Sequence, residues 1–187
     1  MDYRTHCLAG TCSGLILGTM IAQTPYTMDS VLLIGIVTVS SAAGSFLPDI
    51  DEPNSKIGRK AKPISYLINN TVGHRGMMHT PLVALFLTII LLVLKDAYLP
   101  ALLQKYITLG ILGFILGFLS HLFIDSLTKG GIAWLWPLSN RKFSLLPLYT
   151  NNKFHRALVR IATIVITFLV LFVFRGNFIT IFFLSIF

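Results

Sequence analysis

Residues 106–128 read YITLGILGFILGFLSHLFIDSLT, an apolar stretch with a histidine and an aspartate near its end. As a helix it is long enough to cross the hydrocarbon core of a bilayer, which takes roughly 20 residues. Comparable stretches occupy residues 7–22, 30–47, 81–101 and 157–174. The pattern predicts an all-α, multi-pass transmembrane helical bundle of about five spans.

Composition agrees with a membrane protein. The chain is 55% hydrophobic and 12% charged, whereas soluble domains are about 25% charged. A soluble globular protein is therefore excluded. Five spans take up most of the 187 residues, so we expect a single integral membrane domain over residues 1–187.

The basic residues are distributed unevenly over the connections. If every apolar stretch crosses the membrane, the N-terminus and the 49–80 and 129–160 connections share one side, and this side carries most of the 15 Lys and Arg. The opposite side carries only Lys95, Lys105 and Arg175. The positive-inside rule then predicts a cytoplasmic N-terminus in a bacterial inner membrane.

The net charge of +8 also bears on partners. Topology and anionic lipid headgroups account for basic residues at the inner face, so we expect the lipid bilayer, and no nucleic acid, as the partner. Binding of an anionic substrate remains a second explanation. Glycines four apart, at Gly10, Gly14 and Gly18 and at Gly113 and Gly117, permit close helix packing. We expect this packing within the chain, and the oligomeric state stays open.

Most of the histidines and several acids lie at the predicted inner ends of the spans. His121 and Asp125 are four residues apart, so both side chains project from one helix face and can hold one cation. The alternative is a buried His–Asp hydrogen bond that packs helices together.

The connection before residue 81 supplies two more histidines. His74 and His79 flank Gly76, which lets the backbone turn sharply, and Thr80-Pro81 is typical of a helix start. The two imidazoles can converge on one centre. The alternative is a pair of solvated loop histidines.

Acids gather where the second span ends. Asp49, Asp51 and Glu52 lie within four residues beside a negatively charged membrane surface, which is unfavourable unless cations offset them. Asp49 is the better ligand candidate, and Asp51 points the same way if the segment is extended. His6 opens the first span, where a purely structural role is the alternative.

Together these residues predict one metal site. Imidazole and carboxylate are ligands of zinc and, less often, manganese. The candidate metal ligands are His6, Asp49, His74, His79, His121 and Asp125. They fit one ion with some residues outside its coordination shell, or two ions that share Asp49.

The combined motifs resemble a known family. Thr5-His6, Leu47-Pro48-Asp49, His74-Arg75-Gly76 with His79-Thr80, and Ser120-His121 with Asp125 look like the bacterial membrane-bound metal-dependent hydrolases, the YdjM-like inner-membrane proteins distantly similar to zinc-dependent phospholipase C. The resemblance covers roughly residues 1–140. It implies that the same six residues bind the metal.

A metal site at headgroup depth suggests cleavage of a phosphoester bond in a membrane lipid or lipid-linked phosphate at the cytoplasmic leaflet. Arg75 is the candidate phosphate clamp, and Asp51 the candidate general base or further ligand. Alternatives are a non-enzymatic scaffold or regulator with a structural metal, an amide or peptide hydrolase, and a metal transporter. A transporter should hold its ligands near the bilayer midplane, and these lie at one face.

Overall fold

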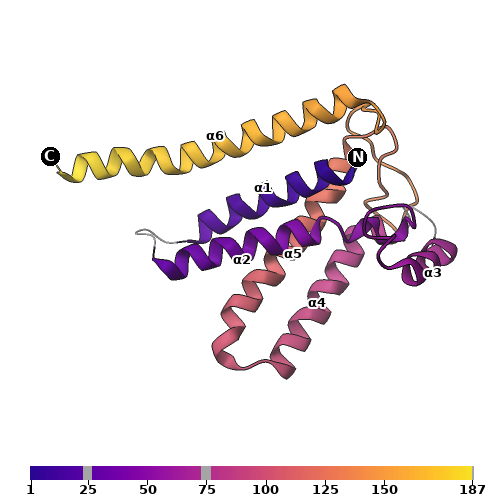
Figure 1. Cartoon of the computed structure of the whole chain (residues 1–187), viewed down its shortest axis with the longest axis horizontal. Helices are drawn as coiled ribbons and strands as arrows, with labels where there is room; N and C mark the ends of the chain where they lie inside the picture. Colours follow the sequence, from indigo (N-terminus) through magenta and orange to yellow (C-terminus); the bar gives the residue numbers. More distant parts are fainter. Residues whose placement is uncertain (23–26, 73–76, 187) are drawn as a thin grey trace.

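The computed structural model describes residues 1–22, 27–72 and 77–186, and the side chains of residues 1–22, 27–71 and 77–173. The α-helices are α1 (Tyr3–Ile21), α2 (Met28–Gly44), α3 (Lys62–Val72), α4 (Pro81–Tyr98), α5 (Ala101–Ser126) and α6 (Lys153–Ile186). Two short 3-10 helices, η1 (Pro48–Asp51) and η2 (Met77–His79), flank α3 along the chain. Figure 1 shows a bundle of long helices with α3 and the longer connections at one end. The predicted all-α bundle is confirmed.

Four segments of the described chain are long and apolar enough to cross a membrane. They are Met28–Asp51, Pro81–Tyr98, Ala101–Ser126 and Lys153–Val173. The fifth expected span, residues 7–22, lies in α1, which is helical but does not join this group. Its buried face is made of small and polar residues, because α1 packs against protein rather than lipid there.

Glycines let α1 and α5 approach α2 closely. A Cβ at Gly14 of α1 would lie 2.6 Å from the Cβ of Ser41, and one at Gly113 of α5 would lie 2.5 Å from the carbonyl oxygen of Val37. Ser41 also donates a buried hydrogen bond of 2.7 Å to the Gly10 carbonyl. The small residues therefore pack helices of the same chain against one another, as predicted.

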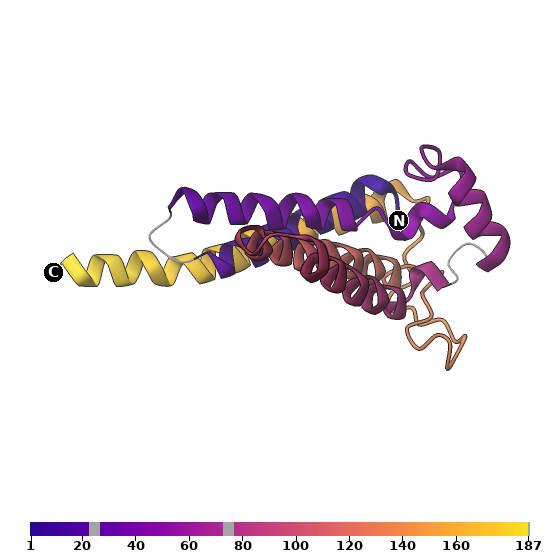
Figure 2. The ribbon, with the colours of Figure 1, turned by 90° about the horizontal axis from the view of Figure 1, so that it is seen from below.

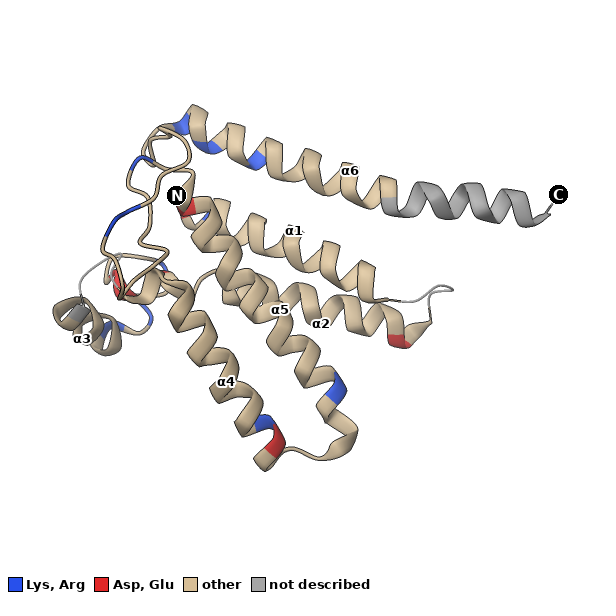
Figure 3. Ribbon diagram, turned by 180° about the vertical axis from the view of Figure 1, so that it is seen from behind, with Lys and Arg blue, Asp and Glu red and all other residues tan. Residues whose placement is uncertain are grey.

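Charged residues mark the two ends of the bundle differently. Figure 3 shows most of the Lys and Arg in the described part of the chain around α3, the long connection and the start of α6. Lys95, in the last turn of α4, and Lys105, near the start of α5, lie at the opposite end. This is the distribution expected of a protein whose α3 end faces the cytoplasm.

The connection from α5 to α6 folds against the end of α5. An antiparallel bridge joins Ile132 to Phe143, and the Trp134 indole nitrogen donates a 2.9 Å hydrogen bond to the Ser126 hydroxyl. Gly131 adopts φ 54°, where a Cβ would lie 2.5 Å from the Phe143 carbonyl oxygen. Figure 2 shows part of this connection projecting from the bundle beyond the start of α4.

Candidate metal centre

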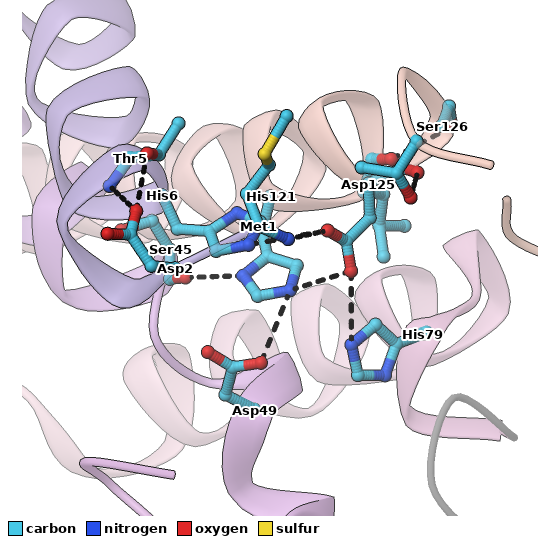
Figure 4. Close-up of polar contacts among 12 residues, drawn as sticks. Met1, Asp2, Thr5, His6, Ser45, Asp49, His79, His121, Asp125 and Ser126 are labelled. Atoms are coloured by element: carbon cyan, nitrogen blue, oxygen red, sulfur yellow. Dashed lines mark hydrogen bonds and ion pairs between the residues drawn. The ribbon is translucent and has the colours of Figure 1, made fainter. Parts of the chain in front are cut away.

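Five of the six predicted ligands meet at the α3 end of the bundle. They come from four elements: His6 from α1, Asp49 from η1, His79 from η2, and His121 and Asp125 from α5. Figure 4 shows their side chains converging. The sixth, His74, and the predicted phosphate clamp Arg75 lie outside the described residues.

His121 has one ring nitrogen fixed by the backbone and the other turned to the acids. Its Nδ1–H donates to the Ser45 carbonyl oxygen over 2.8 Å, so Nε2 carries the lone pair. Nε2 is buried and has no hydrogen-bond partner among the described residues. It lies 3.7 Å from Asp49 Oδ1 and 3.7 Å from Asp125 Oδ2.

The distance between His121 and Asp125 discriminates between a metal site and a direct His–Asp hydrogen bond. A distance of 3.7 Å from His121 to Asp125 is too long for the direct hydrogen bond that we considered as the alternative. Two ligands of one tetrahedral zinc lie roughly 3.3–3.6 Å apart, given bonds of about 2.0–2.2 Å. The spacing is close to that of a coordination shell.

His79 is oriented by an acid behind it. Its Nδ1–H donates to Asp51 Oδ2 over 3.0 Å, and its Nε2 lies 3.8 Å from Asp125 Oδ2. Thr80 and Pro81 start α4 as predicted, although the Thr80 hydroxyl donates to the Met77 carbonyl instead of capping the helix. The start of α4 thus fixes the position of His79 in the cluster.

Asp49 and Asp51 face different histidines. The condition under which both acids would point the same way, an extended segment, is not met. The segment is the 3-10 helix η1, in which Asp49 lies near His121 and Asp51 near His79. Asp51 is fully buried, whereas the Asp49 side chain is 20% exposed. This geometry favours an orienting role for Asp51 over that of a general base.

His6 completes the other side of the cluster. Its ring stacks on that of His121, with centroids 3.7 Å apart and planes 12° apart. Its Nε2 lies 3.4 Å from Asp125 Oδ1, and neither ring nitrogen has a hydrogen-bond partner among the described residues. The Met1 amine lies 2.6 Å from the same oxygen.

Asp125 lies between His6 on one side and His79 and His121 on the other. The possible metal-binding groups are His6, His121 and Asp125, and Asp49, His79 and His121. His121 offers only Nε2, which serves one ion, whereas Asp125 directs Oδ1 to His6 and Oδ2 to His79 and His121. Asp125 therefore faces His6 through one carboxylate oxygen and both His79 and His121 through the other. The expected sharing of Asp49 between two ions stays a prediction.

The cluster opens into a cavity of about 330 Å³. Its lining residues are Met1, Tyr3, Asp49, Glu52, Asn54, Ser55, Lys56, Arg59 and Asp125. The Lys56 ammonium lies 4.3 Å from the centroid of the Tyr3 ring, within cation–π range. The place of Lys56 and Arg59 beside the site was not predicted. Their position in the connection that carries Asp49 was the one signal for it.

Hydrogen bonds among Asp2, Thr5 and Arg160, called the clasp below, hold the start of α1 next to His6. Asp2 caps α1, and the Arg160 guanidinium of α6 donates to Asp2 Oδ2 over 2.5 Å and to the Thr5 hydroxyl over 3.0 Å. Burial alone would raise the pKa of Asp2, but the hydrogen bonds from Arg160 and Thr5 outweigh it and lower the pKa to about 2. The residue next to His6 is thus tied to α6.

The fold and the site define a class: a multi-pass helical membrane protein with a buried His/Asp cluster at one end of its bundle. The chain belongs to the YdjM inner membrane protein family, whose model matches residues 1–186. The predicted location in the inner membrane is thereby confirmed, and so is the YdjM part of the resemblance. Neither the name of the family nor those of the relatives below mention a reaction, a metal or a phospholipase.

Individual relatives support the assignment. The uncharacterized protein YvsG of Bacillus subtilis (strain 168) is 32% identical over 152 residues, which cover 81% of this chain and 82% of YvsG. The inner membrane protein YdjM of Escherichia coli (strain K12) is 38% identical over 103 residues, 54% of this chain and 49% of YdjM. The inner membrane protein YbcI of the same organism is 29% identical over 74% of this chain and 69% of its own. No solved structure matches the chain.

Proposed function

We propose that the protein is a metal-dependent hydrolase that cleaves a phosphoester bond of a membrane lipid or lipid-linked phosphate at the cytoplasmic leaflet. One observation carries the proposal: buried imidazole nitrogens of His6 and His121 face carboxylates at distances too long for good hydrogen bonds, beside a cavity whose lining includes Lys56 and Arg59.

The donor set fits a divalent cation. Unprotonated imidazole nitrogens and carboxylate oxygens are the ligands zinc prefers, and manganese accepts them as well. Asp49, His79 and His121 would hold one ion, and His6 with Asp125 would hold a second or complete the shell of the first. When bound, such an ion activates water and stabilises the negative charge that develops on phosphate.

The remaining roles fall to residues around the cluster. Asp51 fixes the tautomer and direction of His79. Lys56 and Arg59 line the cavity beside Asp49 and offer charge-assisted hydrogen bonds to a phosphate. Arg75 keeps its proposed role as a bidentate clamp because it neighbours His74 in the chain.

A structural metal is the second candidate. His6, His121 and Asp125 are almost wholly buried, as in a site that only pins α1 to α5. The exposed part of Asp49 and the adjoining cavity favour catalysis, because catalytic sites keep a position open whereas structural sites are closed. Transport is less favoured, since the elements that carry the cluster residues meet at one end of the bundle. Peptide hydrolysis is less favoured because the sequence lacks the His-Glu-x-x-His motif.

Metal content of the detergent-purified protein tests the proposal. Elemental analysis should find one or two equivalents of zinc or manganese in the wild type, and His121→Ala should lose them. His155→Ala is the matched control, because His155 lies outside the cluster and accepts a hydrogen bond from the Tyr149 backbone. The metal-loaded wild type should then release phosphate or headgroup from phospholipids or polyprenyl phosphates. A monodisperse wild type that binds no added metal, or a loaded protein inactive on all these substrates, overturns the catalytic proposal.

A further inference from the structure

A second cavity, separate from the metal centre, lies in the connection between α5 and α6. Its volume is about 810 Å³, within the range of roughly 300–1,000 Å³ of small-molecule sites. It is lined by Trp134, Leu135, Ser139, Arg141, Lys142, Phe143 and Ser144. No predicted ligand or catalytic residue is among them.

Several residues that line this cavity are fixed in place by hydrogen bonds. The Ile132–Phe143 bridge consists of two backbone hydrogen bonds of 3.1 and 2.8 Å, so Phe143 is fixed opposite the segment that carries Trp134. The Trp134 indole is anchored through its hydrogen bond to Ser126. The Ser144 hydroxyl donates to the Thr128 carbonyl over 2.7 Å. An aromatic wall is thereby fixed beside Arg141 and Lys142.

The charge around the cavity has one sign. Its lining contains two cations, Arg141 and Lys142, and no acid. The connection from residue 127 to residue 152 likewise contains Lys129, Arg141 and Lys142 but no Asp or Glu. Such a surface attracts an anion, and anionic lipids supply that charge at the cytoplasmic leaflet.

Apolar side chains next to the cavity are exposed. Leu135 is 66% exposed, Leu138 93% and Phe143 55%. Their segment projects from the end of the bundle beyond the start of α4 (Figure 2). Exposed leucines with an adjacent Trp and Arg-Lys pair fit the bilayer interface, where apolar groups reach the acyl chains and cations stay at the headgroups.

We propose that this cavity binds the headgroup of an anionic phospholipid of the surrounding bilayer: Arg141 and Lys142 contact its phosphate, and Trp134 and Phe143 flank its glycerol region. The site is independent of the proposed hydrolysis. It anchors the α5–α6 connection to the membrane, and through Ser126 it adjoins Asp125 of the metal centre.

Tryptophan quenching tests the proposal, because the chain has two tryptophans. Trp136→Phe leaves Trp134 as the only one in the full-length protein, reconstituted in phosphatidylcholine vesicles. Replacing a small fraction of the lipid by phosphatidylglycerol with brominated acyl chains should quench Trp134 several-fold more than the same fraction of brominated phosphatidylcholine. The added substitutions Arg141→Gln and Lys142→Gln should remove this preference.

Lys60→Gln with Lys62→Gln is the control for general surface charge, since neither residue lines the cavity. This pair should keep the preference. Equal quenching by both brominated lipids overturns the proposal, and so does an equal loss in the two double variants. Release of the quenching by millimolar inorganic phosphate would identify a site for a soluble anion and would likewise overturn it.

Discussion

Asp51 lies directly behind His79, with its Oδ2 3.0 Å from the ring nitrogen Nδ1 and the other ring nitrogen facing Asp125. A carboxylate can only accept here, so the proton is on Nδ1 and the lone pair of Nε2 points into the cluster. A neighbour that fixes a ligand in this way typically contributes 10–100-fold to metal affinity.

Asp51→Asn should therefore weaken zinc binding by about 10–100-fold, because an amide can present its NH₂ group to Nδ1 and reverse the tautomer. Competition with a chromophoric chelator measures the affinity in detergent. Glu52→Gln is the matched control, since it removes the neighbouring negative charge without touching His79. Unchanged affinity in Asp51→Asn would contradict the orienting role, and an equal loss in both variants would point to charge alone.

The clasp between Arg160 and Asp2 should make part of the stability depend on pH. The pKa of Asp2 is lowered from 3.8 to about 2 in the folded protein, so its contribution is fully present above about pH 4 and is lost as the pH falls toward 2. Arg160→Gln removes the part of this contribution that comes from Arg160 and leaves the part that comes from Thr5. The difference in thermal stability between wild type and variant should thus be largest near neutral pH and shrink below pH 4.

Differential scanning fluorimetry at several pH values measures that difference. Lys153→Gln, at the start of the same helix, is the control and should show no such dependence. A stability difference that stays constant from pH 6 to pH 2 would show that Arg160 acts without the charge of Asp2.

Close helix packing gives a prediction on stability. A Cβ at Gly117 of α5 would collide with the Ser41 carbonyl oxygen of α2, so Gly117→Ala must push the helices apart. Overpacking of this kind costs typically 1–3 kcal/mol and sometimes more. Gly35→Ala is the control within α2, because a Cβ there meets nothing within 4 Å. A lower melting temperature is expected for Gly117→Ala alone, and equal melting temperatures would contradict the packing.

The helices and the pair of His121 and Asp125 in the cluster were predictable because their signals are local. Apolar length defines a span, and the i, i+4 spacing puts His121 and Asp125 on one face, which the structure confirms. The expected span at residues 7–22 is helical but less apolar than the other four, because its glycines and polar residues pack against α2. Its crossing of the membrane stays a prediction.

The contacts between distant segments were not predictable. The 3-10 turn that separates Asp49 from Asp51 depends on how η1 packs, and no periodicity in four residues reveals it. Asp2 and Arg160 are 158 residues apart in the sequence, and neither lies in a recognisable motif. The metal-dependent hydrolysis, which rests on motif resemblance, stays a prediction.

Lys56 and Arg59 provide the most direct test of the cavity beside the metal cluster. Both are exposed side chains lining the space next to Asp49, so each should contribute a charge-assisted contact to a phosphate held there. With exposed cations the effect should be modest, about tenfold in affinity, or about 1.4 kcal/mol, for the pair. Isothermal titration of zinc-loaded protein with inorganic phosphate measures it.

Lys56→Gln with Arg59→Gln should therefore raise the dissociation constant for phosphate about tenfold and leave the zinc content unchanged. Lys60→Gln with Lys62→Gln removes the same charge from the same connection outside the cavity and should bind phosphate as the wild type does. Because zinc content is read in the same samples, loss of the metal site is distinguished from loss of the anion contacts. Wild-type phosphate affinity in the Lys56 and Arg59 variant would mean that the cavity does not receive the substrate phosphate.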